Sequence, residues 1–375
     1  MSLASLAVTD LRCLGAAALE FGQGLNLIHG PNGSGKTSIL EAVFLVGRGR
    51  SFRTHQTNQL IARARPSFTV FAQTMDPVHR IGFEYRRDEA YVARLDGCDV
   101  RSLAELPSAF FVEVIDPEIH RLIEGVPRER RRWLDWGVFH VEHSFLEHWL
   151  RFSRALRQRN ASLKAGSDPR VWDGELVAHG EQIAIQRAHW FDAVKPSLVQ
   201  TIHRISGLDV ELSYHRGWPA ERTLADVISE GLERDELRGS TFSGPQRADV
   251  MLKIGGKAAR ESLSRGQQKL VASAMVLALL GQLREKVGTP PTLLLDDPGA
   301  ELDLGRLGSL VEAVRELKCQ LVVTSLDPDL RSFGEPDRVF HVEQGHRSEV
   351  IIIRCNIQVR SCPQKSPIPP VISRS

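Results

Sequence analysis

The sequence predicts an α/β fold that is interrupted in the middle of the chain by a helical insertion. Near the N-terminus, short apolar runs alternate with turn residues, which is typical of β-strands. Unbroken apolar runs near residues 292 and 320 are typical of strands buried on both faces of a parallel sheet. Between these parts, residues 116–237 are rich in helix formers, tryptophan and arginine. We therefore expect the two outer parts to form one domain around a sheet, and the middle part to form a helical lobe.

The N-terminal part is expected to contain several strands and one well-defined helix. The apolar runs predict strands at Leu3–Val8, Ala18–Phe21 and Leu25–His29. From Lys36 onward, apolar residues recur every three or four positions until Gly47, which predicts an amphipathic helix. Residues 67–112 return to alternating polar and apolar positions, which predicts further strands.

The C-terminal part resumes the α/β pattern after the insertion. The pattern predicts a strand, a long helix and two buried strands, at Asp249–Ile254, Arg265–Glu285, Thr292–Leu295 and Gln320–Thr324. We therefore assign residues 1–115 and 238–345 to one α/β lobe, and residues 116–237 to a helical lobe, called lobe II. Four prolines follow Cys355, so residues 346–375 are expected to form an atypical, disordered tail.

Composition limits the class of protein. The 375-residue chain is 42% apolar and 25% charged with a net charge of +2, which excludes collagen-like, rod-like and disordered chains. The balance also argues against a protein that coats nucleic acid by bulk charge alone. The cysteines are scattered and form no CxxC pair, and no apolar run approaches the roughly 20 residues of a membrane span. The protein is therefore expected to be cytoplasmic and to have no membrane partner.

A phosphate-binding loop stands between a predicted strand and a predicted helix. It matches the pattern G-x-x-x-x-G-K-[ST] with Gly30, Pro31, Asn32, Gly33, Ser34, Gly35, Lys36 and Thr37. Glycines allow backbone N–H groups to face phosphate oxygens, and the helix N-terminus adds partial positive charge. Lys36 is expected to bind the β- and γ-phosphates and to act in catalysis, and Thr37 to bind Mg²⁺. The expected cofactors are therefore ATP and Mg²⁺.

Two carboxylates follow the buried strand Thr292–Leu295. Ligands of parallel α/β sheets bind at the carboxyl ends of the strands. Asp296 is expected to hold Mg²⁺ through water, and Asp297 to orient or deprotonate the water that attacks the γ-phosphate. Two adjacent acids alone would favour a solvated turn. Together with a phosphate-binding loop in the same chain, they indicate phosphoryl-transfer chemistry.

Many protein classes have such a phosphate-binding loop, and a third motif narrows the choice among them. Leu263–Lys269 is similar to the LSGGQ signature of ABC ATPases and opens a predicted helix, 32 residues before Asp296 when counted from Ser264. Ser264 is expected to cap this helix and, with Gly266, to present a hydroxyl and free N–H groups to an anion. In ABC-type proteins this site completes the γ-phosphate shell of the opposite subunit. Ala300–Asp303 is similar to the D-loop of the same proteins.

The chain as a whole resembles the RecF family of bacterial recombination mediator ATPases. The resemblance covers most of residues 1–345 and rests on the motifs above. It also rests on family-specific stretches at Arg50–Thr54, Gly125–Asp135 and Gly244–Asp249. It implies the head fold of ABC ATPases, a P-loop NTPase fold of the α/β class, split in sequence by a helical lobe. The 228 residues between Lys36 and Ser264 agree, because transporter ATPases are usually shorter there and chromosome-maintenance proteins insert much longer coiled-coil arms.

The resemblance also implies an activity and partners. It implies a weak DNA-dependent ATPase that forms an ATP-dependent homodimer on duplex DNA and at single-strand/duplex gaps. It further implies roles in DNA replication, recombinational repair and the SOS response, with recombinase loading assisted by RecR- and RecO-type mediators. Gln246 stands where the family tends to have histidine, and Thr324-Ser325 occupy the usual switch-histidine position, so a histidine sensor of the γ-phosphate is not expected.

The insertion holds a local excess of positive charge. Between Arg121 and Arg159 there are nine arginines and five acids. The candidates for DNA contacts are Arg128, Arg130, Arg131, Arg132, Arg151 and Arg154. The last two are expected to lie opposite an apolar face formed by Phe145, Trp149 and Phe152. From the residues alone, these guanidiniums are as consistent with ion pairs on a solvated helix as with phosphate contacts.

Two other classes of function stay open on the motifs alone. A transporter-type ABC ATPase subunit would dock on a membrane permease, and both the 228-residue spacing and the arginine-rich insertion argue against it. A small-molecule kinase with a P-loop and a helical lid would be a monomer in ATP and would not use Ser264.

Overall fold

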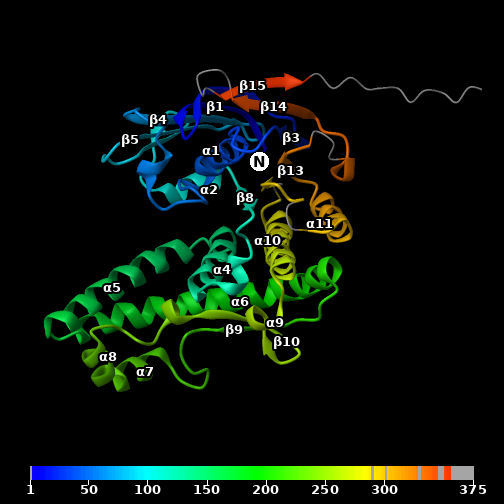
Figure 1. Ribbon diagram of the computed structural model, residues 1–375. Helices are drawn as coiled ribbons and strands as arrows, with labels where there is room; N and C mark the ends of the chain where they lie inside the picture. The colour runs from blue at the N-terminus through cyan, green and yellow to red at the C-terminus, as the bar shows by residue number, and fades with distance from the viewer. Residues whose placement is uncertain (1, 289–290, 300–301, 328–330, 345–349, 356–375) are drawn as a thin grey trace, which may run out of the picture.

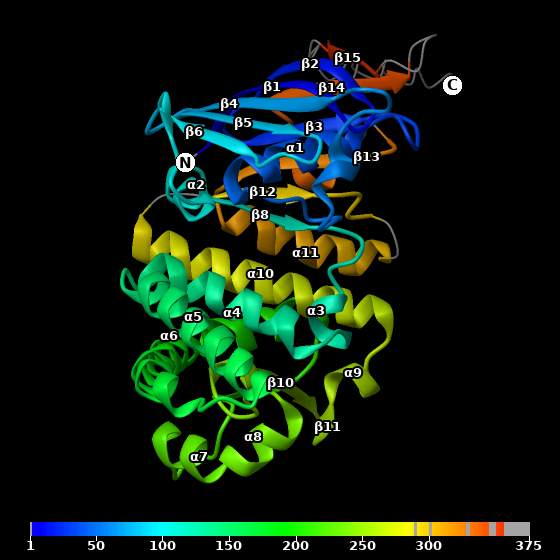
Figure 2. The same cartoon turned by 90° about the vertical axis from the view of Figure 1, so that its left-hand side faces the viewer.

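Two sheets with a helix between them form the upper half of the molecule, and long helices form the lower half (Figure 1). The computed structural model describes residues 2–288, 291–299, 302–327, 331–344 and 350–355. Figure 2 shows the layers from the side, with α10 (Arg265–Val287) and α11 (Leu304–Glu316) lying between the upper half and the helices of the lower half.

The central sheet is mostly parallel and has the strand order β15-β14-β3-β13-β12-β8. Its strands are β3 (Leu25–His29), β8 (Val112–Ile115), β12 (Thr292–Leu295), β13 (Gln320–Ser325), β14 (Arg338–Gln344) and β15 (Val350–Cys355). β3 and β8 precede the helical insertion, and their sheet neighbours β13, β14 and β12 follow it. The predicted α/β fold, split in sequence by helices, is therefore confirmed.

Both faces of the parallel sheet are buried, which explains the unbroken apolar sequence of its strands. Leu294 lies in the core shared with α1 (Lys36–Arg48), whereas Leu293 and Leu295 lie in the core shared with α10. Successive side chains of a strand point to opposite faces, so a strand between two cores needs apolar residues at every position.

An antiparallel sheet covers the other side of α1, with strand order β2-β1-β4-β5-β6-β7. Its strands are β1 (Leu3–Leu11), β2 (Leu14–Glu20), β4 (Ser67–Thr74), β5 (Arg80–Arg86), β6 (Val92–Leu95) and β7 (Cys98–Asp99). A short helix, α2 (Leu106–Ala109), follows, where the sequence pattern predicted strand up to residue 112.

Helices fill the chain between β8 and β9 (Glu211–His215), as predicted. They are α3 (Arg121–Glu124), α4 (Pro127–Val141), α5 (Phe145–Ala165) and α6 (Asp173–Ser206), with α7 (Leu224–Glu230) and α8 (Leu232–Arg238) after β9. The apolar face predicted for α5 is wrong at one position, because Trp149 is 40% exposed while Phe145 and Phe152 are buried. The α-helices described in the C-terminal part are α9 (Ala259–Ser262), α10 (Arg265–Val287) and α11 (Leu304–Glu316). Among the described residues, no helix combines the length and apolarity that a membrane span requires.

A third, small sheet departs from the expected arrangement. The strand predicted at Asp249–Ile254 exists as β10, but it pairs with β9 (Glu211–His215) and β11 (Lys257–Ala258) and not with the parallel sheet. This pairing crosses the expected lobe boundary at residues 237/238, and the division into lobes stays a prediction. The expectation of disorder from residue 346 is wrong for residues 350–355, because these form β15 against β14. Residues 345–349 and 356–375 lie outside the described residues.

Candidate nucleotide-binding site

The glycine-rich loop joins the end of β3 to the start of α1. Gly30 has φ +151°, and a Cβ at this position would lie 2.0 Å from the carbonyl oxygen of Val342. Gly35 caps α1 in a left-handed conformation with φ +110°. Both positions therefore require glycine, one for close packing against β14 and one for the turn into the helix.

Lys36 folds back over this loop. Its Nζ donates hydrogen bonds to the carbonyl oxygens of Gly30 and Pro31, at 2.6 and 2.9 Å, and the residue is 8% exposed. Burial lowers the pKa of Lys36, while the charges of Asp297 and Asp296 oppose that shift. An ammonium group therefore lies at the loop, close enough to two carboxylates to feel their charge.

Ser34 is a buried residue of this loop whose hydroxyl lacks a hydrogen-bond partner in the described part of the protein. Its side chain is 1% exposed, and its Oγ has no hydrogen-bond partner among the residues that the structure describes. A buried hydroxyl without a partner is unfavourable, so this position suits contact with a polar ligand.

Thr37 and Asp296 are hydrogen-bonded near the carboxyl ends of β3 and β12, although they lie 259 positions apart in the sequence. Thr37 Oγ1 donates to the Asp296 carboxylate, with both carboxylate oxygens at 3.0 Å. A hydroxyl and a carboxylate are the oxygen ligands that Mg²⁺ prefers, and Mg²⁺ commonly uses one or two protein groups together with phosphate oxygens and water. These residues therefore fit a nucleotide-bound Mg²⁺.

Thr324, at the end of β13, holds both aspartates in place. Its hydroxyl donates to Asp296 Oδ1 at 2.7 Å and accepts from the backbone N–H of Asp297 at 2.9 Å. Asp297 has φ +47°, a left-handed conformation that is uncommon outside glycine and recurs at functional sites. The sequence identifies Thr324 only as a residue at the usual switch-histidine position, because its contacts with the aspartates depend on which strand ends become neighbours.

Asp116 is a further acid that the sequence analysis did not single out. It follows β8, whose Ile115 carbonyl accepts a hydrogen bond from Asp296 N–H at 3.0 Å. Burial raises the pKa of Asp116 to about 6, and the charges of Asp296 and Glu118 add to the shift. The signal that was available was an acid directly after a buried strand, the same signal that identified Asp296.

The signature motif forms the start of α10, as predicted. Ser264 is the N-cap: its Oγ accepts from Gln267 N–H at 3.4 Å, and Gln267 Oε1 accepts from Ser264 N–H at 3.0 Å. Ser264 is exposed, and Gly266 lies in the first turn of the helix. Part of the D-loop, residues 300–301, lies outside the described residues, while Asp303 caps α11 by accepting from Arg306 N–H at 2.9 Å.

The arginines that are candidates for DNA contacts differ in burial and in whether they have a partner within the protein. Arg130 is 6% exposed and makes a two-point ion pair with Asp249, at 2.8 and 3.0 Å, so of the two alternatives that the sequence leaves open its guanidinium forms the internal ion pair. Three others have partners of their own: Arg131 with the Ala248 carbonyl, Arg132 with Glu129, and Arg151 with Glu147. Arg128 and Arg154 are exposed and form no ion pair within the described part of the chain.

Comparison with known protein families places these motifs in context. The model of the RecF/RecN/SMC N-terminal domain matches residues 2–348. DNA replication and repair protein RecF of Azotobacter vinelandii is 41% identical over 357 residues, which cover 92% of this chain and 98% of that protein. RecF of Pseudomonas paraeruginosa is 39% identical over 365 residues, covering 94% and 99%.

Solved structures agree with the sequence relatives. A structure described as the recombination mediator protein RecF with ATP in the RecFOR pathway has a TM-score of 0.85 and 27% identity, covering 95% of this chain and 98% of that one. An Smc head bound to the C-terminal winged-helix domain of ScpA has a TM-score of 0.60 at 17% identity, covering 96% and 98%. The second likeness shows the shared head fold.

Proposed function

The chain belongs to the RecF family of DNA replication and repair proteins, and we propose that it is an ATP-dependent DNA-binding protein of recombinational repair and replication restart. The observation that carries the proposal is the meeting of Thr37 with Asp296 beside the glycine-rich loop. The solved RecF structure described with ATP supports the choice of nucleotide.

The residues of the glycine-rich loop and those next to it would have separate roles in phosphoryl transfer. Loop N–H groups and Lys36 would bind the phosphates, and Thr37 and Asp296 would hold Mg²⁺, which neutralises charge on the β- and γ-phosphates when bound. Asp297 would orient the attacking water, and Thr324 would position both aspartates through its two hydrogen bonds. Slow hydrolysis then resets the protein.

ATP would also join two copies of the chain. Ser264 is exposed and Gly266 is partly exposed at the start of α10, so the hydroxyl of Ser264 and the first N–H groups of the helix would be available to an anion. In the proposed dimer, this surface meets the γ-phosphate held by the loop of the partner copy. The dimer binds duplex DNA and single-strand/duplex gaps, promotes recombinase loading with RecR- and RecO-type mediators, and contributes to SOS induction.

The proposal is tested by measuring the mass of the protein in solution with and without ATP, on gapped duplex, on single-stranded DNA and without DNA. We expect a monomer without ATP, a dimer with ATP, and the most stable dimer on gapped duplex. A monomer in the presence of ATP and gapped duplex would contradict the proposal.

Two variants separate the steps. Asp297→Asn should keep ATP binding and trap the dimer on DNA, and rapid single-turnover hydrolysis by this variant would remove Asp297 from catalysis. Ser264→Arg should keep ATP binding and lose the dimer. The matched control is Ser262→Arg, because Ser262 is an exposed serine just before the signature. Equal dimerisation by both serine variants would rule out the signature contact.

A further inference from the structure

Three arginines gather around one exposed phenylalanine ring in the segment between α8 and β10. The guanidinium carbons of Arg234, Arg238 and Arg247 lie 4.3, 4.8 and 5.3 Å from the centroid of the Phe242 ring. The ring itself is 38% exposed. We call these four residues the arginine cluster. Cation–π contacts at such distances are attractive and align the guanidiniums on one aromatic side chain.

Within the described part of the chain, the positive charge of the arginine cluster is only partly offset by acids. Arg238 and Arg247 form no ion pair within the described residues. Arg234 lies 3.9 Å from Asp235, but that carboxylate already accepts from Arg159 at 2.7 Å and from the N–H of Phe242 at 3.0 Å. All three guanidiniums share one ring, so any two lie within about 10 Å, roughly one Debye length at 0.1 M salt.

The helix itself brings two of these charges together. Arg234 and Arg238 are four residues apart on α8, and like charges at this spacing repel and destabilise a helix. Glu233 and Glu236 lie on the same helix, but the helical period turns them away from the arginine side. Asp235 contacts Arg234 but is also bound to Arg159, so it offsets only part of the repulsion, and a site with such residual positive charge is suited to an anionic ligand.

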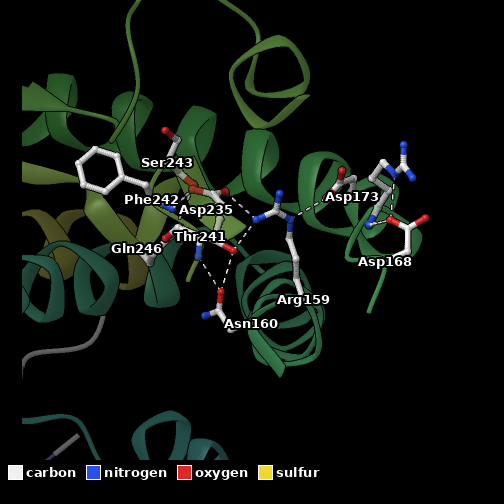
Figure 3. Close-up of polar contacts among 10 residues, drawn as sticks. Arg159, Asn160, Asp168, Asp173, Asp235, Thr241, Phe242, Ser243 and Gln246 are labelled. Atoms are coloured by element: carbon white, nitrogen blue, oxygen red, sulfur yellow. Dashed lines mark hydrogen bonds and ion pairs between the residues drawn. The ribbon is translucent and has the colours of Figure 1, made fainter. Parts of the chain in front are cut away.

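A buried network holds the backbone beneath the arginine cluster (Figure 3). Arg159, which is fully buried, donates to Asp235 and to Thr241 Oγ1, at 2.7 and 2.8 Å. Asn160 Oδ1 accepts from both the N–H and the hydroxyl of Thr241, each at 2.8 Å. Figure 3 shows the Phe242 ring pointing away from this network.

The far side of the same loop is held as well. Gln246 Nε2 donates to the carbonyl oxygens of Ser243 and Thr241, at 3.0 and 3.4 Å. Buried Arg187 donates to the carbonyl of Pro245 at 2.7 Å. The loop that carries Phe242 and Arg247 is therefore ordered before any ligand arrives, which reduces the entropic cost of binding.

We propose that the arginine cluster is a binding site for the phosphodiester backbone of DNA. The inference rests on the proposed function, which supplies DNA as a ligand, and it names the residues that bind it. Guanidinium forks match phosphate geometry, and three converging positive charges favour a ligand that carries several negative charges. The contact is independent of base sequence, because Phe242 orders the arginines and presents no base-reading group.

The test measures affinity for duplex DNA in ATP over a series of salt concentrations. The variant is Arg238→Gln with Arg247→Gln, since both side chains are exposed and free of ion pairs within the described residues. Each lost phosphate contact should flatten the log–log salt slope by about 0.9, so the double variant should lose about 1.8. At about 0.1 M salt the same dependence corresponds to an affinity loss on the order of 50-fold.

The control is a second double variant that removes the same number of positive charges from another part of the surface. Arg63→Gln with Arg101→Gln removes two exposed arginines from the α/β lobe and should leave slope and affinity close to wild type. Phe242→Leu should weaken binding about threefold without changing the slope, because the charges stay while their alignment is lost. Thermal unfolding of each variant checks that the fold is kept.

The outcomes separate this site from the proposed function. If the wild type binds duplex DNA in ATP and the Arg238/Arg247 variant binds equally well, the site is wrong and the proposed function stands. Equal losses in both double variants would show an effect of bulk charge and would also overturn the site. If the wild type binds no duplex DNA in ATP, the proposed function fails together with the site. The Arg238/Arg247 variant could also bind DNA as the wild type does but no longer bind a glutamate-rich peptide. This result would assign the arginine cluster to an acidic protein partner and overturn the DNA site.

Discussion

The glycine-rich loop and the arginine-rich helices of lobe II use positive charge in opposite ways. Lys36 is held by two carbonyl oxygens of its own loop, and its ammonium remains available to a phosphate. Arg130 and Arg159 are also buried, but each is bound by carboxylates inside the protein. In the proposed function the charge of Lys36 binds a ligand, whereas the charges of Arg130 and Arg159 stabilise the fold. A count of arginines in lobe II therefore says little about DNA contacts until the partner of each one is known.

The largest expected effect comes from breaking the buried network of lobe II. Asp235→Ala leaves the fully buried Arg159 with Asp173 as its remaining carboxylate and removes the acceptor of the Phe242 N–H. Removing one partner of a buried ion pair typically costs 3–5 kcal/mol, so the free energy of unfolding should fall by about that amount in urea titrations.

The matched control for that prediction is Asp168→Ala. Asp168 pairs with Arg170 at 2.9 Å, but both side chains are exposed, and the change should cost less than about 0.5 kcal/mol. Figure 3 shows both aspartates. Equal losses for the two variants would contradict the view that burial decides the effect.

Lys36→Ala should have the opposite effect to Asp235→Ala, because it should abolish ATP turnover and leave stability nearly unchanged. We expect ATP turnover to fall by about 10²–10³, because a positioned charge at the transferring phosphate is removed. The free energy of unfolding should change by less than about 1 kcal/mol, because within the described residues the ammonium of Lys36 forms hydrogen bonds to carbonyl oxygens and no ion pair with a carboxylate. Steady-state ATPase assays and urea titrations measure the two effects. Loss of stability with retained turnover would reverse the roles assigned to the two regions.

His140 tests the boundary between the two regions, because it lies on α4 close to Arg48, the last residue of α1. Burial, with a smaller contribution from the charge of Arg48, lowers the pKa of His140 to about 3. Above pH 6.5 the ring is neutral in both states and stability is complete. As the pH falls below 6.5, the unfolded chain binds a proton that the folded chain excludes, so stability is lost progressively down to about pH 3.

His140→Phe should remove that loss while retaining an aromatic ring beside Phe111 and Trp136. Between pH 7 and pH 5, the wild type should lose about 2 kcal/mol more free energy of unfolding than the variant. His143→Phe, at an exposed position on the next loop, should keep the wild-type pH dependence. Parallel curves for wild type and His140→Phe would show that His140 is not held neutral.

The smallest effect is expected at the surface of α5. Arg151 pairs with Glu147 one helical turn away, at 3.0 Å, and both side chains are more than half exposed. Arg151→Gln should change the free energy of unfolding by less than about 0.5 kcal/mol, because solvent screens such pairs. A loss above about 1 kcal/mol would show that surface pairs in lobe II contribute more than the comparison with Arg159 allows.

Much of the site could be predicted because it is local in sequence. The loop, the helix after it and the N-cap at Ser264 depend on backbone conformations of adjacent residues, which glycine and serine favour directly. Asp116 and Thr324 were not predicted as site residues. Both follow from the parallel arrangement of strand ends, and no spacing in the chain shows which ends become neighbours.

The small sheet of β9 and β10 has a similar explanation. β9 and β10 are joined by α7, α8 and a long loop, so no hairpin turn signals the pairing of these two strands. The period of β10 predicted a strand correctly, but a strand pattern does not identify its partner. Residues 350–355 likewise gained a strand from pairing with β14, which composition alone did not indicate.

The sequence by itself determined the α/β class, the helical insertion, the phosphate-binding loop and the order of the motifs around it. These follow from residue types at fixed short spacings, where backbone geometry leaves few alternatives. The tertiary structure alone decided which arginines pair internally and which surround Phe242. Ion pairs and burial depend on distances in space: Arg130 finds its carboxylate 119 residues away, and Arg159 finds one 76 residues away. Charge can be counted along a chain, but its availability to a ligand is set by folding.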